Sequence, residues 1–321
     1  MKYLVTGGAG YVGSVVTTML LEGGHEVVVL DDLATNDANG IPAGATVERG
    51  RVQDSADVLD PGFDGVFHFA GLIANGESME KPEIYWDANV SGTLALLEAM
   101  RKSDVGTLVF SSSASVYGNP SELPVTETAV TRPTSTYGAN KLAADYAITS
   151  YAIAHGLAAV SLRYFNVAGA WKDASGLWHG ERHDPETHLI PIILACAAGD
   201  RDKLQIYGTD YDTADGTCVR DYIHVADLAR AHLLAVDKAE AHRHRIYNLG
   251  NGNGFSNREV LAAAQRVTGR DIPALDAPRR PGDPATLVAS SAAAERDLGW
   301  RPDRPALEDI IADAWEFYQR G

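Results

Sequence analysis

The chain opens with Lys2-Tyr3-Leu4-Val5-Thr6-Gly7-Gly8-Ala9-Gly10-Tyr11-Val12-Gly13, a stretch with an apolar half and a glycine-rich half. The apolar half predicts a buried strand over residues 2–6, and apolar side chains at helical spacing predict a helix over residues 11–22. Glycines recur at every third position in the connecting turn, where a side chain would keep the backbone away from a pyrophosphate. The start of the helix adds free N–H donors and a partial positive charge. The stretch therefore predicts a phosphate-binding turn between a strand and a helix.

An acid after the next predicted strand, residues 26–30, indicates which nucleotide this turn binds. Asp31 stands 24 residues after Gly7, can accept hydrogen bonds from a ribose diol and would repel a 2′-phosphate. We therefore expect NAD rather than NADP as the cofactor. A tight turn with a surface acid is the alternative, but the flanking strand and helix favour nucleotide binding. The cofactor contacts expected in this part of the chain are Gly7, Gly10, Tyr11, Val12, Gly13, Asp31, Asp32 and Leu33.

Strands and helices continue to alternate as far as Val167. The pattern predicts further strands over residues 65–69, 107–110 and 158–162, and helices over 90–101 and 137–154. Apolar strands separated by helices are typical of a parallel sheet covered on both faces. The expected fold class is α/β, a doubly wound parallel sheet (Rossmann fold) with a smaller C-terminal α/β substrate domain. The predicted domains are residues 1–167, which bind the cofactor, and 168–321, which mainly bind substrate, with parts that return to the sheet.

Composition excludes several classes of protein. The 321 residues include 43 acidic and 27 basic side chains, a formal net charge of −16, which argues against nucleic acid or an anionic membrane as a partner. The longest apolar stretch, residues 189–198, is shorter than the ~18 residues of a membrane helix. Met1-Lys2 leads directly into a strand rather than an apolar leader, and Cys196 and Cys218 are the only cysteines. We expect a cytoplasmic protein.

Three further residues could carry acid–base chemistry. Tyr137 and Lys141 stand four residues apart in a predicted helix and so share one face. A free tyrosine, with a pKa near ~10, is a poor base at neutral pH, but a neighbouring cation favours the phenolate. Ser113 follows the strand over residues 107–110, at the edge where doubly wound sheets bind ligands. Such a helix pair alone is ordinary, but beside the glycine turn and Ser113 we interpret the three residues as catalytic.

Nearly the whole chain resembles the extended short-chain dehydrogenase/reductases. Segments shared with the wider superfamily include the glycine turn, Leu30-Asp31-Asp32-Leu33, His68-Phe69-Ala70-Gly71 with Gly76-Glu77-Ser78, Phe110 to Gly118, and Tyr137 to Lys141. The resemblance continues in Thr187-His188-Leu189-Ile190-Pro191. Three segments narrow it to nucleotide-sugar enzymes: Arg163-Tyr164-Phe165-Asn166, Arg220-Asp221-Tyr222-Ile223-His224-Val225 and Arg279-Arg280-Pro281-Gly282-Asp283.

The resemblance implies roles for particular residues. Tyr137 would be the acid/base, Lys141 would hold the nicotinamide ribose, and Ser113 would bond the sugar hydroxyl. The cofactor would also be lined by Phe69, Ala70, Gly71, Asn89, Ser111 and Tyr164. The UDP part of a UDP-sugar substrate would be held by Asn166, His188, Leu189, Tyr207, Arg220, Arg280 and Asp283. Arginines suit a diphosphate because they pair with it in bidentate fashion, although Arg220 could instead form a structural pair with Asp221 or Asp227.

Three positions depart from or vary within the family pattern. Arg51 stands where many members carry an aspartate that touches the adenine, a contact that Asp54 could replace. Ile73 stands where some members have a lysine near the cofactor. Both changes concern the strength of NAD binding. Leu287 falls at the position that limits the size of the sugar, so acceptance of N-acetylated sugars stays open.

The activity that the resemblance implies is NAD-dependent 4-epimerisation of a nucleotide sugar, interconverting UDP-galactose and UDP-glucose through a 4-keto sugar. An epimerase of UDP-glucuronate or a UDP-pentose is an alternative. A 4,6-dehydratase is a weaker one, because Ala114-Ser115 follows Ser113 where that chemistry needs an Asp-Glu pair. A non-catalytic dinucleotide sensor belongs to another class, but a sensor has no reason to keep a tuned base.

Two weaker signals remain. His179, His183 and His188 with Asp184 suggest a metal site, but no cysteine or second acid is apparent, so we interpret the segment as a solvated loop and expect no metal. The helices over 90–101 and 137–154 have more apolar positions than one sheet face needs. Relatives pair through such helices, and we expect a homodimer, with a buried core face as the simpler explanation.

Overall fold

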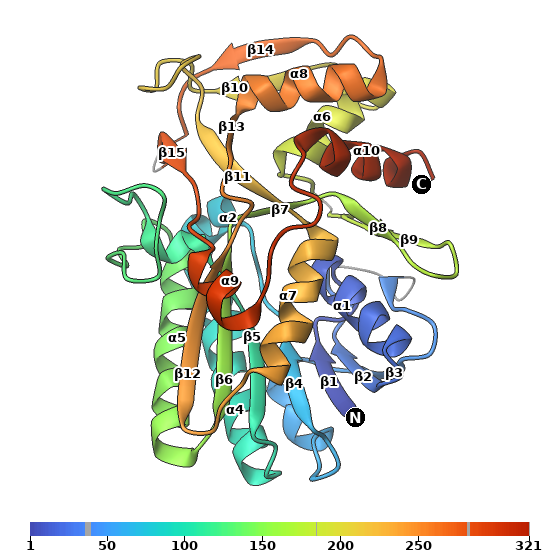
Figure 1. Cartoon of the computed structure of the whole chain (residues 1–321), viewed down its shortest axis with the longest axis vertical. Helices are drawn as coiled ribbons and strands as arrows, with labels where there is room; N and C mark the ends of the chain where they lie inside the picture. Colours follow the sequence, from blue (N-terminus) through green and yellow to red (C-terminus); the bar gives the residue numbers. More distant parts are fainter. Residues whose placement is uncertain (36–39, 184, 281–282, 321) are drawn as a thin grey trace.

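The computed structural model describes residues 1–35, 40–183, 185–280 and 283–320 (Figure 1). A seven-stranded parallel sheet lies at its centre, with strand order β12-β6-β5-β4-β1-β2-β3. The bounds of these strands are β1 Lys2–Thr6, β2 Glu26–Asp31, β3 Thr46–Arg49, β4 Gly65–His68, β5 Thr107–Ser113, β6 Ala158–Tyr164 and β12 Arg243–Leu249. The order reverses between β1 and β4, as in a doubly wound fold, so the predicted fold class is confirmed.

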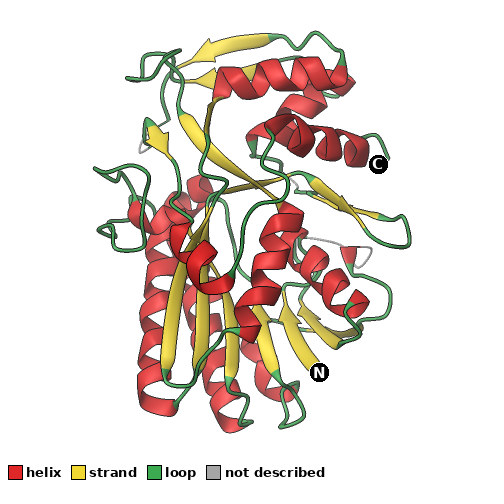
Figure 2. Ribbon diagram, in the orientation of Figure 1, coloured by secondary structure: helices red, strands yellow, loops and turns green. Residues whose placement is uncertain are grey.

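Helices cover both faces of this sheet (Figure 2). Successive strand residues point to opposite faces, so Tyr3 and Val5 join one apolar cluster and Leu4 the other. The first cluster packs against α1 (Tyr11–Glu22), α7 (Val225–Asp237) and α9 (Ala292–Leu298). The second packs against α4 (Gly92–Lys102) and α5 (Thr136–His155). Burial on both faces explains why these strands are continuously apolar.

The later part of the chain builds a second region around β11 (Val219–His224), at the top of Figure 1. Beside β11 lie β7 (Asn166–Ala168), β13 (Gly254–Ser256) and β15 (Thr286–Leu287). An apolar cluster joins α6 (Leu189–Ala198), α8 (Asn257–Thr268) and α10 (Leu307–Tyr318). Two smaller sheets pair β8 (Ala170–Lys172) with β9 (Trp178–Gly180), and β10 (Leu204–Tyr207) with β14 (Ala274–Ala277).

Short elements complete the connections. They are η2 (Val52–Asp57), α2 (Asn75–Glu80), α3 (Pro82–Tyr85), the π-helical η3 (Trp86–Ser91) and η4 (Ala114–Tyr117). Within the described ranges, no helix is long and apolar enough to cross a membrane.

Two strands of the central sheet do not follow from the sequence pattern. All four residues of β3 are exposed at the sheet edge, so this strand lacks an apolar pattern. The other, β12, begins with Arg243-His244-Arg245 and pairs with β6, so the chain returns to the sheet after residue 167. The imidazole of His244 bonds to Thr149 and Ser161 at 2.8 and 2.7 Å, and burial lowers its pKa to about 4.

Candidate active site at the carboxyl edge of the sheet

The glycine turn takes a shape that side chains would prevent. Gly7 has φ = +74°, and its N–H donates to the carbonyl of Leu30 at 2.9 Å. A Cβ on Gly13 would collide with the carbonyl oxygen of Gly7. Helix α1 then begins at Tyr11, after Gly10, without a side-chain cap and without an acid in its first turn. The first N–H groups of α1 are therefore left for an anionic ligand, as the sequence predicts.

Asp31 lies at the end of β2 beside this turn. One carboxylate oxygen accepts the N–H of Ala9 at 3.0 Å, and the other accepts the N–H of Leu33 at 2.9 Å. Leu33, directly after Asp32, has a left-handed backbone conformation with φ = +58°. Asp31 thus joins the glycine turn to the loop after β2, and each carboxylate oxygen can still accept a further hydrogen bond.

The loop after β4 approaches the same turn. The N–H groups of Phe69 and Ala70 donate to the carbonyl of Thr6 at 2.9 and 3.0 Å. Asn89 holds the next residues, because its amide both accepts from the Leu72 N–H at 2.8 Å and donates to the Leu72 carbonyl at 3.0 Å. A Cβ on Gly71 would lie 2.7 Å from the Asn89 side-chain oxygen. The structure therefore brings Asn89 to the predicted place, where it shapes the loop through backbone contacts.

The three predicted catalytic residues meet at the end of β5. Burial raises the pKa of Tyr137, and a hydrogen bond with Ser113 opposes that rise. Lys141 is 3% exposed and donates from Nζ to the carbonyl of Ser111 at 2.7 Å, with Nζ 5.8 Å from the centre of the Tyr137 ring. Burial also lowers the pKa of Lys141 to about 8. In the chain by itself, burial therefore has the largest effect on Tyr137, and its pKa lies above that of a free tyrosine.

The neighbouring strands β5 and β6 place Ser111 and Tyr164, two more predicted cofactor residues, beside the three predicted catalytic residues. Ser113 and Tyr164 are direct partners in the register of β5 and β6. The hydroxyl groups of Ser111 and Tyr164 hydrogen-bond to each other, which fixes the tyrosine ring at the strand end. Both residues thus lie at the edge that the sequence predicts for the cofactor.

The second region contributes the residues predicted to hold a diphosphate. Arg220 is 11% exposed on its side chain and lies 3.8 Å from Asp283, while the guanidinium of Arg280 stacks 4.1 Å from the centre of the Tyr207 ring. These four predicted residues therefore form two pairs. Asn166 starts β7, whose register places it beside Tyr222 of β11.

The suggested structural pairing of Arg220 with Asp221 or Asp227 does not occur. Asp221 is fully buried and accepts backbone N–H groups from Asn251, Gly252 and Ala289 at 2.8, 3.1 and 3.0 Å. Burial raises its pKa to about 6. Asp227 instead pairs with Arg230 at 2.9 Å. Arg220 is therefore not held by either neighbouring acid, which fits a role in ligand binding.

Leu189 and His188 lie at the start of α6, but the His188 imidazole is already engaged. Its Nδ1 contacts the carboxylate of Glu181. Burial alone would lower the pKa of His188, but the hydrogen bond and charge of Glu181 together with the charge of Glu186 raise it. His179 is not part of this group, because it pairs with Asp173 at 3.0 Å. The prediction that no second acid accompanies the histidines is wrong, since Glu181 and Glu186 lie beside His183 and His188. Asp184, the acid predicted to accompany them, lies outside the described residues.

Arg51 and Ile73, the two residues that depart from the family pattern near the cofactor, both face solvent. Arg51 pairs with Asp87 across an exposed surface, and Ile73 is 42% exposed. Asp54, the suggested replacement acid, accepts the Arg51 N–H at 2.8 Å and so caps η2. Leu287 pairs with Arg220 in the β11–β15 register and packs on an apolar cluster that includes Val116 and Phe165.

A model of the NAD dependent epimerase/dehydratase family matches residues 3–250. The chain belongs to this family. The UDP-glucose 4-epimerase of Streptomyces lividans is 56% identical over 322 residues, covering 99% of this chain and 96% of that protein. The structure of a UDP-glucose 4-epimerase from Brucella ovis with NAD has 42% identity, a TM-score of 0.92 and 98% coverage of both chains. Another from Bifidobacterium longum, with NAD+ and UDP, has 37% identity, a TM-score of 0.92, and coverage of 100% and 99%.

The residues present fit the NAD that gives the epimerase/dehydratase family its name. An uncapped helix start follows the glycine turn, and Asp31 stands at the end of β2. Helix α5, by contrast, has its first turn capped by Ser135, whose hydroxyl accepts the Gly138 N–H at 3.1 Å. The free N–H groups at the start of α1 thus support NAD as the cofactor, in agreement with the family to which the chain belongs.

One positioning residue of this epimerase/dehydratase site does not emerge from the sequence. Ser78 is fully buried, and its hydroxyl accepts the N–H of Tyr137 at 3.1 Å while donating to the carbonyl of Asn75 at 2.7 Å. It ties α2 to the start of α5 and so holds Tyr137 in place. No local spacing signals this contact, because the two residues are 59 positions apart.

Proposed function

We propose that this protein is a UDP-glucose 4-epimerase that interconverts UDP-galactose and UDP-glucose with tightly bound NAD. The observation that carries the proposal is the meeting of Tyr137, Ser113 and Lys141 beside a phosphate-binding turn. Curated relatives of that activity support it, because the similarity to the Streptomyces lividans enzyme extends over 99% of this chain.

The chain supplies the acid–base part of the reaction. Bound NAD⁺ supplies the hydride acceptor and later the donor, and its positive charge favours the phenolate. Tyr137 takes the proton of the sugar 4-hydroxyl and later returns it to the same oxygen, while Ser113 orients that hydroxyl. Burial raises the pKa of Tyr137, so the phenol regains a proton readily in the return step. Lys141, which donates to the carbonyl of Ser111, would hold the cofactor ribose and add positive charge.

The 4-keto sugar formed between the two proton transfers must present its opposite face before the return. The sugar therefore has to be held loosely and the UDP part tightly. We assign the UDP part to Asn166, Leu189, Tyr207, Arg220, Arg280 and Asp283, and leave His188 beside it, engaged with Glu181. Two guanidinium groups offer the bidentate donors that a diphosphate requires.

The test is a Tyr137→Phe variant with a matched Tyr146→Phe control on the same helix, where Tyr146 is 62% exposed. Removing the hydroxyl should lower kcat by about 10²- to 10⁴-fold, because proton transfer is lost, while UDP binding is unchanged. Activity is followed as conversion of UDP-galactose to UDP-glucose. Normal turnover by Tyr137→Phe would show that the mechanism is wrong.

A substrate panel separates the remaining activities. UDP-galactose, UDP-glucuronate, UDP-xylose and dTDP-glucose are each incubated with the protein, and the 4-epimer or a keto product is measured. We expect the 4-epimer from UDP-galactose. A preference for the uronate or pentose would reassign the sugar, a keto product from dTDP-glucose would indicate a dehydratase, and no turnover at all would favour a dinucleotide sensor.

The oligomeric state and location are also proposals. We propose a homodimer through α4 and α5, because large apolar side chains on their outer faces are left uncovered, among them Leu94, Tyr146 and Ile153. We propose a cytoplasmic location, supported by Cys196 and Cys218, which are buried and unpaired. The boundary at residue 167 likewise remains a proposal, supported by β7 joining the second region at Asn166.

A further inference from the structure

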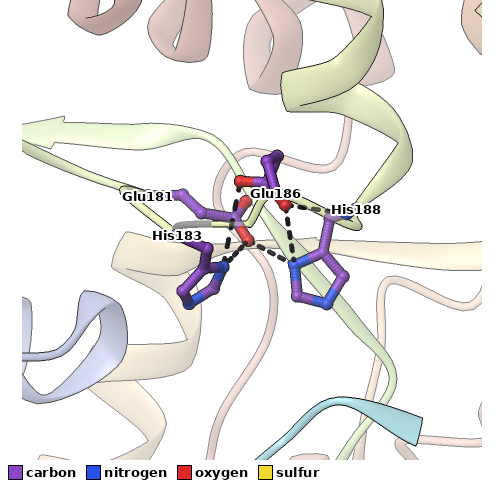
Figure 3. Close-up of side chains that lie close together, drawn as sticks. All are labelled: Glu181, His183, Glu186 and His188. Atoms are coloured by element: carbon purple, nitrogen blue, oxygen red, sulfur yellow. Dashed lines mark hydrogen bonds and ion pairs between the residues drawn. The ribbon is translucent and has the colours of Figure 1, made fainter. Parts of the chain in front are cut away.

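A compact group of two imidazoles and two carboxylates lies in the segment between β9 and α6. Figure 3 shows the carboxylates of Glu181 and Glu186 between the rings of His183 and His188. One ligand atom from each of the four residues can be chosen so that all lie within 4.8 Å of one another. Both histidines turn Nδ1 toward the carboxylates. Imidazole nitrogen and carboxylate oxygen are ligands that zinc accepts.

The distances suit a four-coordinate ion. With metal–ligand bonds of about 2.1 Å, the ligand atoms of a tetrahedron lie about 3.4 Å apart. In the structure, His183 Nδ1 lies 3.0 Å from Glu181 Oε1 and 3.8 Å from Glu186 Oε2. His188 Nδ1 lies 3.7 Å from Glu186 Oε1 and closer to Glu181. Only small movements of the side chains are needed to admit an ion at the centre.

The charge of the group also calls for a cation. The side chains of Glu181 and Glu186 are 6% and 22% exposed, so two carboxylates are removed from water close together. Among the described residues, every ion pair of these two acids is with His183 or His188, and none is with a lysine or arginine. The nearest basic neighbour in sequence, Arg182, stacks on the Phe317 ring instead. A divalent ion would balance both carboxylates and leave the imidazoles neutral.

We propose that Glu181, His183, Glu186 and His188 form a structural binding site for one zinc ion. The four ligands come from a single segment of eight residues and would fill all four positions, as in closed structural sites. Glu186 is already oriented by the backbone, because its Oε1 accepts the N–H groups of Thr187 and His188 at 2.7 Å. This site replaces the expectation of a solvated loop without metal.

The position of the group gives the ion a role in the fold. His188 is the residue that precedes α6, and Leu189 begins that helix. Glu181 and Glu186 also lie near enough to Tyr11 at the start of α1 to affect it electrostatically. The Tyr11 hydroxyl donates to the carbonyl of Gly169 at 2.6 Å. The ion would therefore fix a segment that lies between the cofactor-binding helix and α6.

The experiment measures metal content and does not depend on the proposed activity. Tag-free protein is treated with a chelator, reloaded with zinc, freed of excess metal and assayed by mass spectrometry for zinc per chain. We expect one zinc per chain in the wild type. Reloading with Co²⁺ should give the absorption bands of tetrahedral coordination, and added zinc should raise Tm by mass action.

Two variants and a control make the test specific. His183→Ala and Glu181→Gln should each bind zinc more weakly, by more than the ~10- to 100-fold that loss of an outer-shell partner costs. His155→Asn, at an exposed position outside the group, should keep one zinc per chain. Circular dichroism checks that each variant is folded. The proposal is overturned if the wild type holds no zinc after reloading, or if both variants bind it as tightly as the wild type does.

Discussion

His68 ends β4 directly before the loop that carries Phe69, and its imidazole is enclosed by neutral partners. The side chain is 1% exposed, with Nδ1 2.7 Å from the hydroxyl of Thr6 and Nε2 3.0 Å from that of Thr93. Burial, reinforced by the charge of Lys141, lowers the pKa of His68 to about 3. The folded protein therefore keeps this histidine neutral under conditions in which an unfolded chain would protonate it.

The difference in the pKa of His68 between the folded and unfolded chain predicts that this residue makes the protein less stable in acid. Below about pH 6.5 the unfolded chain gains a proton at His68 that the folded chain does not, so the free energy of unfolding falls as pH falls. The contribution should be about 1.4 kcal/mol per pH unit between about pH 6 and 4. Denaturant unfolding of the wild type and His68→Asn is measured at several pH values. The free energy of unfolding of the wild type should fall relative to that of His68→Asn as the pH is lowered. A difference in the free energy of unfolding that stays constant with pH would contradict the prediction.

The element formed by β1, the glycine turn and α1 depends on Gly13. A Cβ at this position would collide with the Gly7 carbonyl oxygen and lie 3.1 Å from the Cα of Gly8, and backbone atoms cannot rotate away. Gly13→Ala should therefore lower the free energy of unfolding by about 1–3 kcal/mol and weaken NAD binding. Thermal unfolding and a fluorescence titration with NAD measure the two effects.

The matched control for that substitution is Gly76→Ala in α2. Beyond the backbone of α2 itself and the neighbouring residues, a Cβ built on Gly76 has no atom within 4 Å. This change should leave NAD binding intact and raise the free energy of unfolding by at most about 1 kcal/mol. Equal stability and equal NAD affinity in Gly13→Ala and the wild type would show that the turn can adapt.

The sequence predicts well those strands and helices whose formation is determined by residues close together in the chain. The strand over residues 2–6 and the helix over 11–22 match β1 and α1 because apolar spacing and glycine act within a few residues. Contacts between distant segments leave no such pattern in the sequence. For this reason neither the bond from Tyr137 to Ser78 nor the pairing of β12 with β6 could be predicted. The grouping of Glu181 and Glu186 around His183 leaves no pattern either, because a loop has no periodicity from which the contact could be predicted.

At the scale of the whole molecule, the second region cannot separate cleanly from the sheet. Along its full length, β12 pairs with β6 through seven residues, from Arg243 to Leu249. Helix α7 directly follows β11 of the second region, yet it packs into the apolar cluster on one face of the central sheet. The residues that end β5 and β6 and those on β11 are thus held by one interleaved framework, which fixes the distance between the predicted cofactor and UDP positions.

The outer faces of α4 and α5 predict assembly of two such molecules. On the side of these helices that faces the sheet, residues such as Leu97 and Ile148 are buried. The sheet covers only this part of their apolar surface. On the other side, Tyr146 and Ile153 are 62% and 72% exposed and stand seven residues apart, on one face of α5; Leu94 of α4 is 42% exposed. Exposed apolar side chains of this kind favour a two-fold interface with a second copy.

Light scattering after size-exclusion chromatography tests this assembly. The wild type should have twice the mass of the 34.3 kDa chain, and the double variant Tyr146→Glu/Ile153→Glu should have the mass of one chain, because charges on both copies would oppose burial. Val130→Glu is the matched control: Val130 is 80% exposed but lies outside both helices, so this variant should remain a dimer. A monomeric wild type, or a double variant that still elutes as a dimer, would exclude the α4–α5 interface.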